Sequence, residues 1–439
     1  MIGFDLIGPV NGGKSGHDGF NDSKIRRTTK GNIRPSLLQH HRSDNHRSYA
    51  GGTGCYLPRP DALIQAYRDR LPEAALEAEL RKAVADVVDR QVRAGVDIVN
   101  DGEFGKPSTS EVDFGAWATY LYTRLSGFEF REAESRGELV KRIFGESKDR
   151  VDFASFYAAG LDGTATATAT GAGTTRGPTY RIPINTKAVE YTGQREVQRD
   201  IANLKAAIEG QPIEEAYMSA VFTGVQFDQS EHYETKEEQA VAIAEAIREE
   251  YKAIVDAGFN VQIDDPLLVN EYELRYSVSG DLAAYRKWAQ WHIGLLNHAL
   301  EGIPEEKVRY HLCWGSWVGP HSTDLPLRDV VDLLLKINAS QYSFEAANPQ
   351  HEHEWRVWKD AKLPDGKALI PGVVTHKTNI LERPEVVADR LIRYANVVGR
   401  ENVIAGTDCG LGGRMHPPLA WAKLEALAAG ARLASEELW

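Results

Sequence analysis

A histidine and a cysteine stand two residues apart near the end of an apolar run. The run extends from Val308 to Gly315 and contains His311 and Cys313. In a β-strand, residues two apart point to the same face of the sheet. An imidazole and a thiolate directed to one place are two of the donors from which proteins build zinc sites. The pair therefore predicts half of a metal site, which other parts of the chain must complete.

Strand-like and helical segments alternate along the chain from residue 49. Eight strands are predicted, at 54–60, 96–103, 217–222, 259–265, 308–315, 341–346, 369–376 and 402–410. Helical patterns occupy 74–94, 236–257, 282–300, 327–337, 352–359, 384–398 and 418–434. This alternation predicts an α/β fold, a (β/α)8 TIM barrel whose active site lies at the carboxyl ends of its strands.

Polar residues gather at these predicted strand ends. Besides His311 and Cys313, the strand ends carry Glu103, Asp264, Asp265, Glu345, His376, Lys377 and Cys409. One imidazole, two thiolates and one carboxylate, from His311, Cys313, Glu345 and Cys409, make a four-ligand zinc set. On spacing alone a second interpretation stays open, in which the two cysteines and the histidine are ordinary buried residues.

The charge of such a ligand set indicates the chemistry that it favours. Zinc with two thiolates and one carboxylate carries a net charge of −1, which makes the site a poor generator of hydroxide. Coordination by the metal deprotonates a thiol outright. The set is therefore better suited to activating an incoming thiol for S-alkylation than to activating water.

Composition limits the classes of protein and of partner. The chain has 439 residues, a formal charge of −12 and three cysteines. The negative charge argues against a nucleic acid or an anionic membrane as the main partner. Few cysteines argue against a secreted disulfide framework, and no apolar run approaches the roughly 20 residues that span a bilayer. We read no signal peptide, so a cytoplasmic enzyme is expected.

Two segments depart from the barrel pattern. Residues 1–48 carry eight basic and four acidic side chains and are expected to form an N-terminal extension, ahead of a single barrel over 49–439. The P-loop-like pattern at 8–15 is followed by glycines and aspartates instead of a helical sequence, so we do not interpret it as a nucleotide site. Residues 104–213 are expected to be an insertion after the second strand that covers one end of the barrel or forms a homo-oligomer contact.

The strand-end motifs resemble those of the cobalamin-independent methionine synthase superfamily, specifically its C-terminal catalytic barrel. The matching pieces are NDGEFGKPS (100–108), VQIDDP (261–266), YHLCWG (310–315), YSFEAANP (342–349), IPGVVTHKTN (370–379) and VIAGTDCGLG (403–412). The resemblance implies a Zn²⁺ cofactor held by His311, Cys313, Glu345 and Cys409. It also implies that Glu103 and Asp264 or Asp265 bind the polar end of the thiol substrate.

The departures from the family pattern affect the donor and the proton transfer. The chain has one barrel where full methionine synthases have two, and so looks closer to single-barrel relatives such as epoxyalkane:coenzyme M transferase. The family's catalytic histidine aligns with Lys377, next to His376, so either side chain is a candidate for protonating the leaving group. The resemblance implies a zinc-dependent transferase that moves a methyl or alkyl group to or from a small thiol; a zinc-dependent hydrolase or lyase is the alternative.

Two aromatic or histidine-rich features have more than one interpretation. Trp314 either stacks on a flat donor in the substrate site or fills the top layer of the core. His351 and His353 belong either to a polar loop or to a group that contacts the substrate or the metal ligands. His321 lies in the loop after the fifth predicted strand and has no assigned role.

Overall fold

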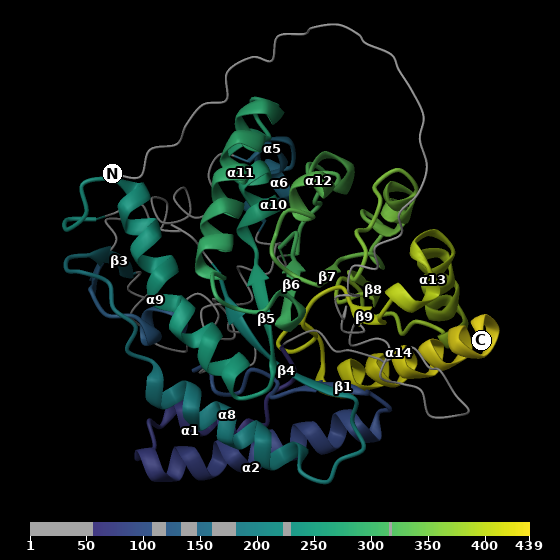
Figure 1. Ribbon diagram of the computed structural model, residues 1–439, viewed down its shortest axis with the longest axis horizontal. Helices are drawn as coiled ribbons and strands as arrows, with labels where there is room; N and C mark the ends of the chain where they lie inside the picture. Colours follow the sequence, from purple (N-terminus) through teal and green to yellow (C-terminus); the bar gives the residue numbers. More distant parts are fainter. Residues whose placement is uncertain (1–55, 108–119, 133–146, 160–180, 223–229, 316–317) are drawn as a thin grey trace, which may run out of the picture. The chain divides into compact units, whose positions relative to one another are not determined.

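The strands of the protein form a curled parallel sheet with helices on its outer side. The computed structural model describes residues 56–107, 120–132, 147–159, 181–222, 230–315 and 318–439. Seven strands are hydrogen-bonded in the order β1-β4-β5-β6-β7-β8-β9 (Figure 1), and every neighbouring pair is parallel. Their bounds are Ile98–Asn100, Glu215–Val221, Asn260–Asp265, Val308–Leu312, Gln341–Phe344, Ala368–Val374 and Gly406–Thr407.

The strands are buried on both faces, as parallel strands between a barrel interior and a helix layer must be. All residues of β5, β6, β7 and β8 are buried. The register pairs His311 of β6 with Asp264 of β5 on one side and with Ser343 of β7 on the other. Because side chains at paired positions share a face, these three side chains point to the same side of the sheet.

Long helices cover the outer side of the sheet. They are α2 (Glu73–Arg93), α8 (Gln194–Ile208), α9 (Lys236–Asp256), α11 (Leu282–Ala299), α13 (Pro384–Val398) and α14 (Pro417–Leu438), as Figure 1 shows. The start of α9 is fixed by a capping box, in which Thr235 and Glu238 bond each other's backbone N–H groups. Shorter elements are α1 (Asp61–Arg68), α10 (Leu267–Glu271), α12 (Val331–Leu334), the π-helix η2 (Tyr272–Tyr276) and the 3₁₀ helices η3 (Glu305–Lys307), η4 (Leu327–Asp329), η5 (Glu352–Lys359) and η6 (Arg400–Asn402).

The predicted barrel class is confirmed, with local differences. Seven of the eight predicted strands are present, and the last is shorter than expected. The helix predicted over 327–337 is replaced by η4 and the four-residue α12. The strand predicted over 54–60 begins outside the described residues, and its described part, 56–60, forms no strand. There Leu57 N–H donates to Gly102 O at 3.5 Å, and Gly412 N–H donates to Tyr56 O at 2.8 Å, so this segment bridges the loops that follow β1 and β9.

The range predicted as an insertion contains both peripheral elements and a helix of the barrel layer. An antiparallel pair is formed by β2 (Phe128–Glu132) and β3 (Arg181–Asn185), and two short helices are α5 (Lys148–Asp152) and α6 (Ala154–Ala158). Helix α8 packs on α2 and α9 and precedes β4. Asp149 accepts hydrogen bonds from Ser322, in the loop after β6, which places α5 against the loops at the carboxyl ends of the strands.

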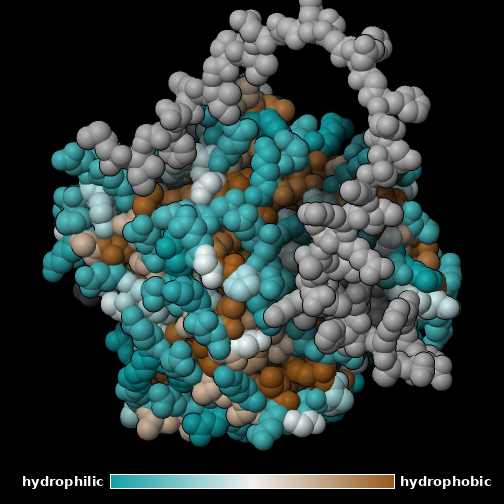
Figure 2. Space-filling view, viewed as in Figure 1, coloured by the Kyte–Doolittle hydropathy of each residue, from teal (hydrophilic) through white to brown (hydrophobic). Residues whose placement is uncertain are grey.

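The surface of the described residues is mainly hydrophilic on the face shown in Figure 2, with hydrophobic patches between the polar groups. Among the described helices, none is long and apolar enough to cross a membrane. The predicted N-terminal extension over 1–48 and the P-loop-like pattern at 8–15 lie outside the described residues.

Candidate metal centre

One imidazole and two thiols meet at the carboxyl ends of β6 and β9. The ligand atoms of His311, Cys313 and Cys409 all lie within 4.8 Å of one another. The two Sγ atoms are 3.8 Å apart, and all three side chains are buried. His311 belongs to β6, Cys313 follows it, and Cys409 follows β9, so parallel strands bring together donors that are 96 residues apart in sequence.

Ser343 orients the imidazole of His311 toward the two sulfurs. Its Oγ lies 3.1 Å from His311 Nδ1, and Nε2 of the same ring is buried without a hydrogen-bond partner among the described residues. A proton on Nδ1 leaves the lone pair on Nε2, which is the arrangement that metal-binding histidines adopt. A buried polar atom without a partner costs free energy unless a ligand serves it. The donor set and this orphaned nitrogen therefore fit zinc.

The pKa values of the two thiols are shifted in opposite directions. A hydrogen bond from Cys313 lowers the pKa of Cys409 well below its ordinary value, although burial acts in the opposite direction. The same interaction, with burial, raises the pKa of Cys313. Burial lowers the pKa of His311, but the adjacent Cys409 sulfur more than offsets it, so the pKa is raised. The site therefore already favours one thiolate, the form in which cysteine binds a metal.

Glu345, the fourth predicted ligand, lies beside this group and not within it. Its carboxylate belongs to a second cluster with His376 and Asp408, whose ligand atoms also lie within 4.8 Å of one another. Glu345 Oε1 accepts from the backbone N–H of Trp314 at 3.1 Å, and Oε2 accepts from Asn348 Nδ2 at 2.8 Å. Burial raises the pKa of Glu345. The structure thus brings together three of the four predicted ligands and places the fourth carboxylate next to them.

Asp408 supports the segment that carries Glu345. Its Oδ1 accepts from the backbone N–H groups of Ala346 and Ala347 at 2.7 and 2.8 Å. Burial, with the charge of Glu345, raises the pKa of Asp408 to about 7. The sequence places Asp408 at the end of the eighth predicted strand, directly before Cys409, but assigns it no role. Its position next to a predicted ligand was the available signal.

His376 and Lys377, the two candidates for proton transfer, have different surroundings. His376 is buried, and neither ring nitrogen has a hydrogen-bond partner among the described residues. Burial, with the charges of Arg414 and Lys377, lowers its pKa well below the ordinary value. Lys377 is partly exposed, and its Nζ donates to Gly315 O at 2.8 Å and contacts His321 Nε2 at 2.9 Å. Of the two candidates, Lys377 is the one that is partly exposed and hydrogen-bonded to described residues.

The adjacent aspartates of β5 point in opposite directions. Asp264 faces His311, and its Oδ2 is buried without a hydrogen-bond partner among the described residues. Burial, with the charge of Glu103, raises the pKa of Asp264 to about 6. Asp265 instead bonds His292 of α11 at 2.7 Å and Tyr310 at 3.0 Å. The structure therefore brings Asp264 to the site and places Asp265 on the helix side of the sheet.

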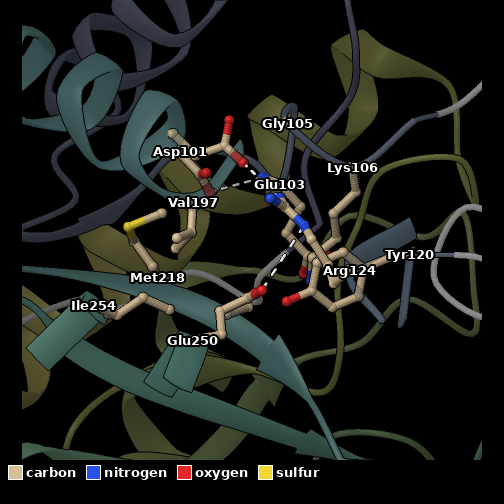
Figure 3. Close-up of a pocket in the computed structure, with 12 residues that line it drawn as sticks. Asp101, Glu103, Gly105, Lys106, Tyr120, Arg124, Val197, Met218, Glu250 and Ile254 are labelled. Atoms are coloured by element: carbon tan, nitrogen blue, oxygen red, sulfur yellow. Dashed lines mark hydrogen bonds and ion pairs between the residues drawn. The ribbon is translucent and has the colours of Figure 1, made fainter. Parts of the chain in front are cut away.

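Glu103 lies in a buried cluster of charges between β1, β4, α8 and α9 (Figure 3). Its Oε2 accepts from Lys106 Nζ at 2.7 Å, and Arg124 bonds Asp200 at 2.9 Å. These side chains line a cavity of about 20 Å³, enough for one water molecule. Glu103 has φ of +60°, a backbone conformation that is rare for residues other than glycine.

Trp314 is a packed residue. Its side chain is buried, and its Nε1–H donates to Leu325 O at 2.8 Å. The centroid of its ring lies 4.1 Å from the centroid of the His351 ring. The structure therefore supports the core interpretation of Trp314. His351 contacts Trp314 and is bonded to Asp324 and Glu354, whereas His353 is exposed, so the choice between their two interpretations stays a prediction.

The fold and these strand-end donors define an α/β barrel with a candidate metal centre at its mouth. The model of the family "Cobalamin-independent synthase, Catalytic domain" matches residues 141–432, more than half of the chain. The chain belongs to this family.

Two relatives and one solved structure give the extent of the similarity. The chain is 25% identical to a 2-hydroxypropyl-CoM lyase of Xanthobacter autotrophicus over 84% of this chain and 88% of that protein. It is 25% identical to a methionine synthase of Sulfolobus acidocaldarius over 87% of this chain and 91% of that protein. A B12-independent methionine synthase of Shewanella sp., solved with selenomethionine, matches with a TM-score of 0.62 and 20% identity over 89% of this chain and 99% of that one, a likeness of fold.

Proposed function

We propose that this protein is a zinc-dependent transferase that moves a methyl or other alkyl group to or from a small thiol. The observation that carries the proposal is the convergence of the unpartnered His311 Nε2 with the sulfurs of Cys313 and Cys409. Membership of the cobalamin-independent synthase family supports it. Relatives named as a methionine synthase and as a CoM lyase act on sulfur compounds according to those names.

His311, Cys313 and Cys409 would hold the metal, with Glu345 beside them as the fourth donor. When bound, zinc would supply a Lewis acid that lowers the pKa of an incoming thiol. The residues around it have separate tasks. Glu103 and Asp264 offer carboxylate oxygens to the polar end of the substrate, and Lys377 offers N–H donors at the site's edge.

The ammonium of Lys377 suits an alkyl donor whose leaving atom becomes negative. The thiolate attacks the carbon, the bond between that carbon and the leaving atom breaks, and the leaving atom takes the proton of Lys377 Nζ. An ammonium group stabilises a leaving oxygen or nitrogen that becomes negative in the transition state.

Zinc analysis and thiol titration test the proposal. Purified protein is expected to contain about one zinc per chain, the stoichiometry of a single four-ligand site. In the cobalt-substituted protein, one class of thiol is expected to add a sulfur-to-metal charge-transfer band. Protein without stoichiometric metal, or a cobalt spectrum that no thiol changes, would contradict the proposal.

The lyase alternative is favoured by the name of one relative, the 2-hydroxypropyl-CoM lyase. Cleavage of a carbon–sulfur bond is the reverse of thiol alkylation and uses the same donors. A hydrolase would instead activate water, for which two thiolate ligands are poorly suited. X-ray absorption separates a thiol reaction from hydrolysis, because only a thiol reaction adds a sulfur to the metal's ligands when substrate binds.

A further inference from the structure

Lys377 is joined to a run of buried side chains that the proposed function does not use. Its Nζ lies 2.9 Å from His321 Nε2, and Nδ1 of that ring lies 3.0 Å from both carboxylate oxygens of Asp324. Asp324 Oδ2 lies 3.3 Å from His351 Nε2, and His351 Nδ1 lies 2.9 Å from Glu354 Oε2. The run therefore leads from the mouth of the barrel to η5.

The chemistry of the donors fixes the direction of these hydrogen bonds. A lysine ammonium only donates, so His321 Nε2 accepts from Lys377 and Nδ1 carries the proton toward Asp324. Burial raises the pKa of Asp324, but hydrogen bonds from His321 and His351 more than offset it, so the pKa is lowered and a carboxylate persists. Although burial lowers the pKa of His351, Asp324 and Glu354 raise it to about 10. The charges of Lys377 and His351 thus balance those of the two carboxylates.

Gly315 connects this run with the sulfur atoms. Its carbonyl accepts from Lys377 Nζ at 2.8 Å, and its N–H donates to Cys313 Sγ at 3.3 Å. One residue therefore separates the ammonium from a predicted metal ligand. Lys377 has three N–H donors. With one on Gly315 and one on His321, the third has no partner among the described residues and can bind a substrate.

His321 adopts a strained backbone conformation. Its φ is +51°, in the left-handed region, although it is not a glycine. Such a conformation is costly for a residue with a side chain, and it persists where surrounding contacts impose it, often at functional sites. The side chain is buried at 7% exposure, so its imidazole is held from both sides by Lys377 and Asp324.

We propose that His321 and Asp324 are positioning residues that hold the Lys377 ammonium at the edge of the metal site, with one N–H left for the leaving group. The proposal rests on the proposed alkyl transfer. In that step the sulfur–carbon bond forms, the bond to the leaving atom breaks, and this atom takes a proton from Nζ. The resulting amine regains a proton from solvent, to which Lys377 is partly exposed.

A double-mutant cycle tests whether His321 acts through Lys377. Lys377→Met is expected to lower kcat by about 10²–10⁴-fold, the usual contribution of a general acid. His321→Ala and Asp324→Asn are each expected to lower kcat by about 10–100-fold, as loss of an orienting contact does, with KM for the thiol unchanged. On the Lys377→Met background the same two substitutions should have no further effect. Additive losses would overturn the proposal.

The chain offers a matched control. His292 is a buried histidine that bonds a carboxylate, Asp265, on the helix side of the sheet and has no contact with Lys377. His292→Asn therefore measures the general cost of removing a buried imidazole–carboxylate pair. Any loss that it causes should be the same with and without Lys377→Met.

Proton NMR tests the positioning without turnover. The N–H of His321 Nδ1, bonded to a carboxylate, should give a far-downfield signal in protein with ¹⁵N-labelled histidine, identified by its loss in His321→Ala. The signal should disappear in Asp324→Asn and shift in Lys377→Met. A signal indifferent to Lys377→Met would overturn the proposal even if alkyl transfer is confirmed. If the signal shifts in Lys377→Met but no thiol changes the metal spectrum, the proposed function is contradicted. The contact between His321 and Lys377 is then still supported.

Discussion

The two sides of the barrel mouth differ in how their polar groups are satisfied. The sulfur side comprises His311, Cys313, Cys409 and His376; the carboxylate side comprises Asp101, Glu103, Glu250 and Asp264. On the sulfur side, three imidazole nitrogens are buried without a hydrogen-bond partner among the described residues. On the carboxylate side, Lys106 neutralises Glu103, and Tyr191 donates to Glu250 at 2.7 Å.

The difference indicates which side depends on an added ligand. Buried polar atoms without partners are costly, so the sulfur side is the one that fits the proposed metal. On the carboxylate side, the chain supplies partners for Glu103 and Glu250, whereas Asp264 Oδ2 has none among the described residues. Substitutions on the sulfur side should therefore change metal content, whereas those on the carboxylate side should change substrate affinity or stability.

The largest expected effect is that of Cys409→Ser. It replaces a thiolate that lies 3.8 Å from Cys313 Sγ with a hydroxyl, a much weaker zinc ligand. Metal content should fall from about one per chain to near zero, and activity should be lost with it. Asp101→Asn, a buried change on the carboxylate side, is the control and should retain the metal. Full metal content in Cys409→Ser would remove this cysteine from the ligand set.

A smaller effect on the metal is expected from Ser343→Ala. The variant removes the oxygen that orients His311 through Nδ1, and loss of such a contact weakens metal affinity by about 10–100-fold. Competition with a zinc chelator measures the change. Ser219→Ala is the control on the carboxylate side, because its buried Oγ belongs to a residue that lines the cavity beside Glu103. Equal effects of the two substitutions would show that the two sides are not distinct.

On the carboxylate side, Glu103→Gln should act on the substrate. A hydrogen bond between charged groups contributes about 1.5 kcal/mol or more, so KM for the thiol should rise about tenfold. Zinc content should stay at the wild-type level. Steady-state kinetics with metal analysis on the same sample checks both statements. An unchanged KM would show that Glu103 does not bind the substrate and only pairs with Lys106.

The last prediction concerns the pH dependence of stability and leaves metal content and substrate affinity unchanged. Burial raises the pKa of Glu250 to about 8, from an ordinary value of 4.5. The folded protein thus keeps a proton that the unfolded chain releases between these values, so this group's contribution to stability falls as pH rises through that window. The slope is at most about 1.4 kcal/mol per pH unit. Glu250→Gln should flatten the fall in denaturant titrations from pH 5 to 8, and an unchanged slope would contradict the assignment.

The convergence of His311, Cys313 and Cys409 could be predicted because strand alternation and strand order are visible in the sequence. The separation of Asp264 from Asp265 follows from the same alternation, once His311 is known to face the barrel interior. The contact of Ser343 with His311 required the register between β6 and β7, which the sequence does not contain. The sequence therefore predicts which side chains of one strand share a face. It does not predict which side chain of the neighbouring strand contacts them.

The contacts of two loop residues and the position of one helix were not predicted, for different reasons. The position of His321 depends on a left-handed backbone in a loop without periodicity. The reach of Lys377 to Gly315 depends on a long flexible side chain. Helix α8, in contrast, carries a readable pattern, because Val197, Ile201 and Leu204 follow helical spacing. It was absorbed into the predicted insertion because the low-complexity run at 160–178 obscured the resumption of the barrel pattern.

The short bridge at Tyr56 and Leu57 has a consequence for the order of folding. It bonds Gly102 after β1 and Gly412 after β9, which lie at opposite ends of the described barrel sequence. Contacts of such high sequence separation require closure of a long loop, which costs chain entropy. The bridge between the strand ends that carry Glu103 and Cys409 therefore needs both ends of the described sequence. A nascent chain acquires the complete mouth of the barrel only after nearly all of its sequence is available.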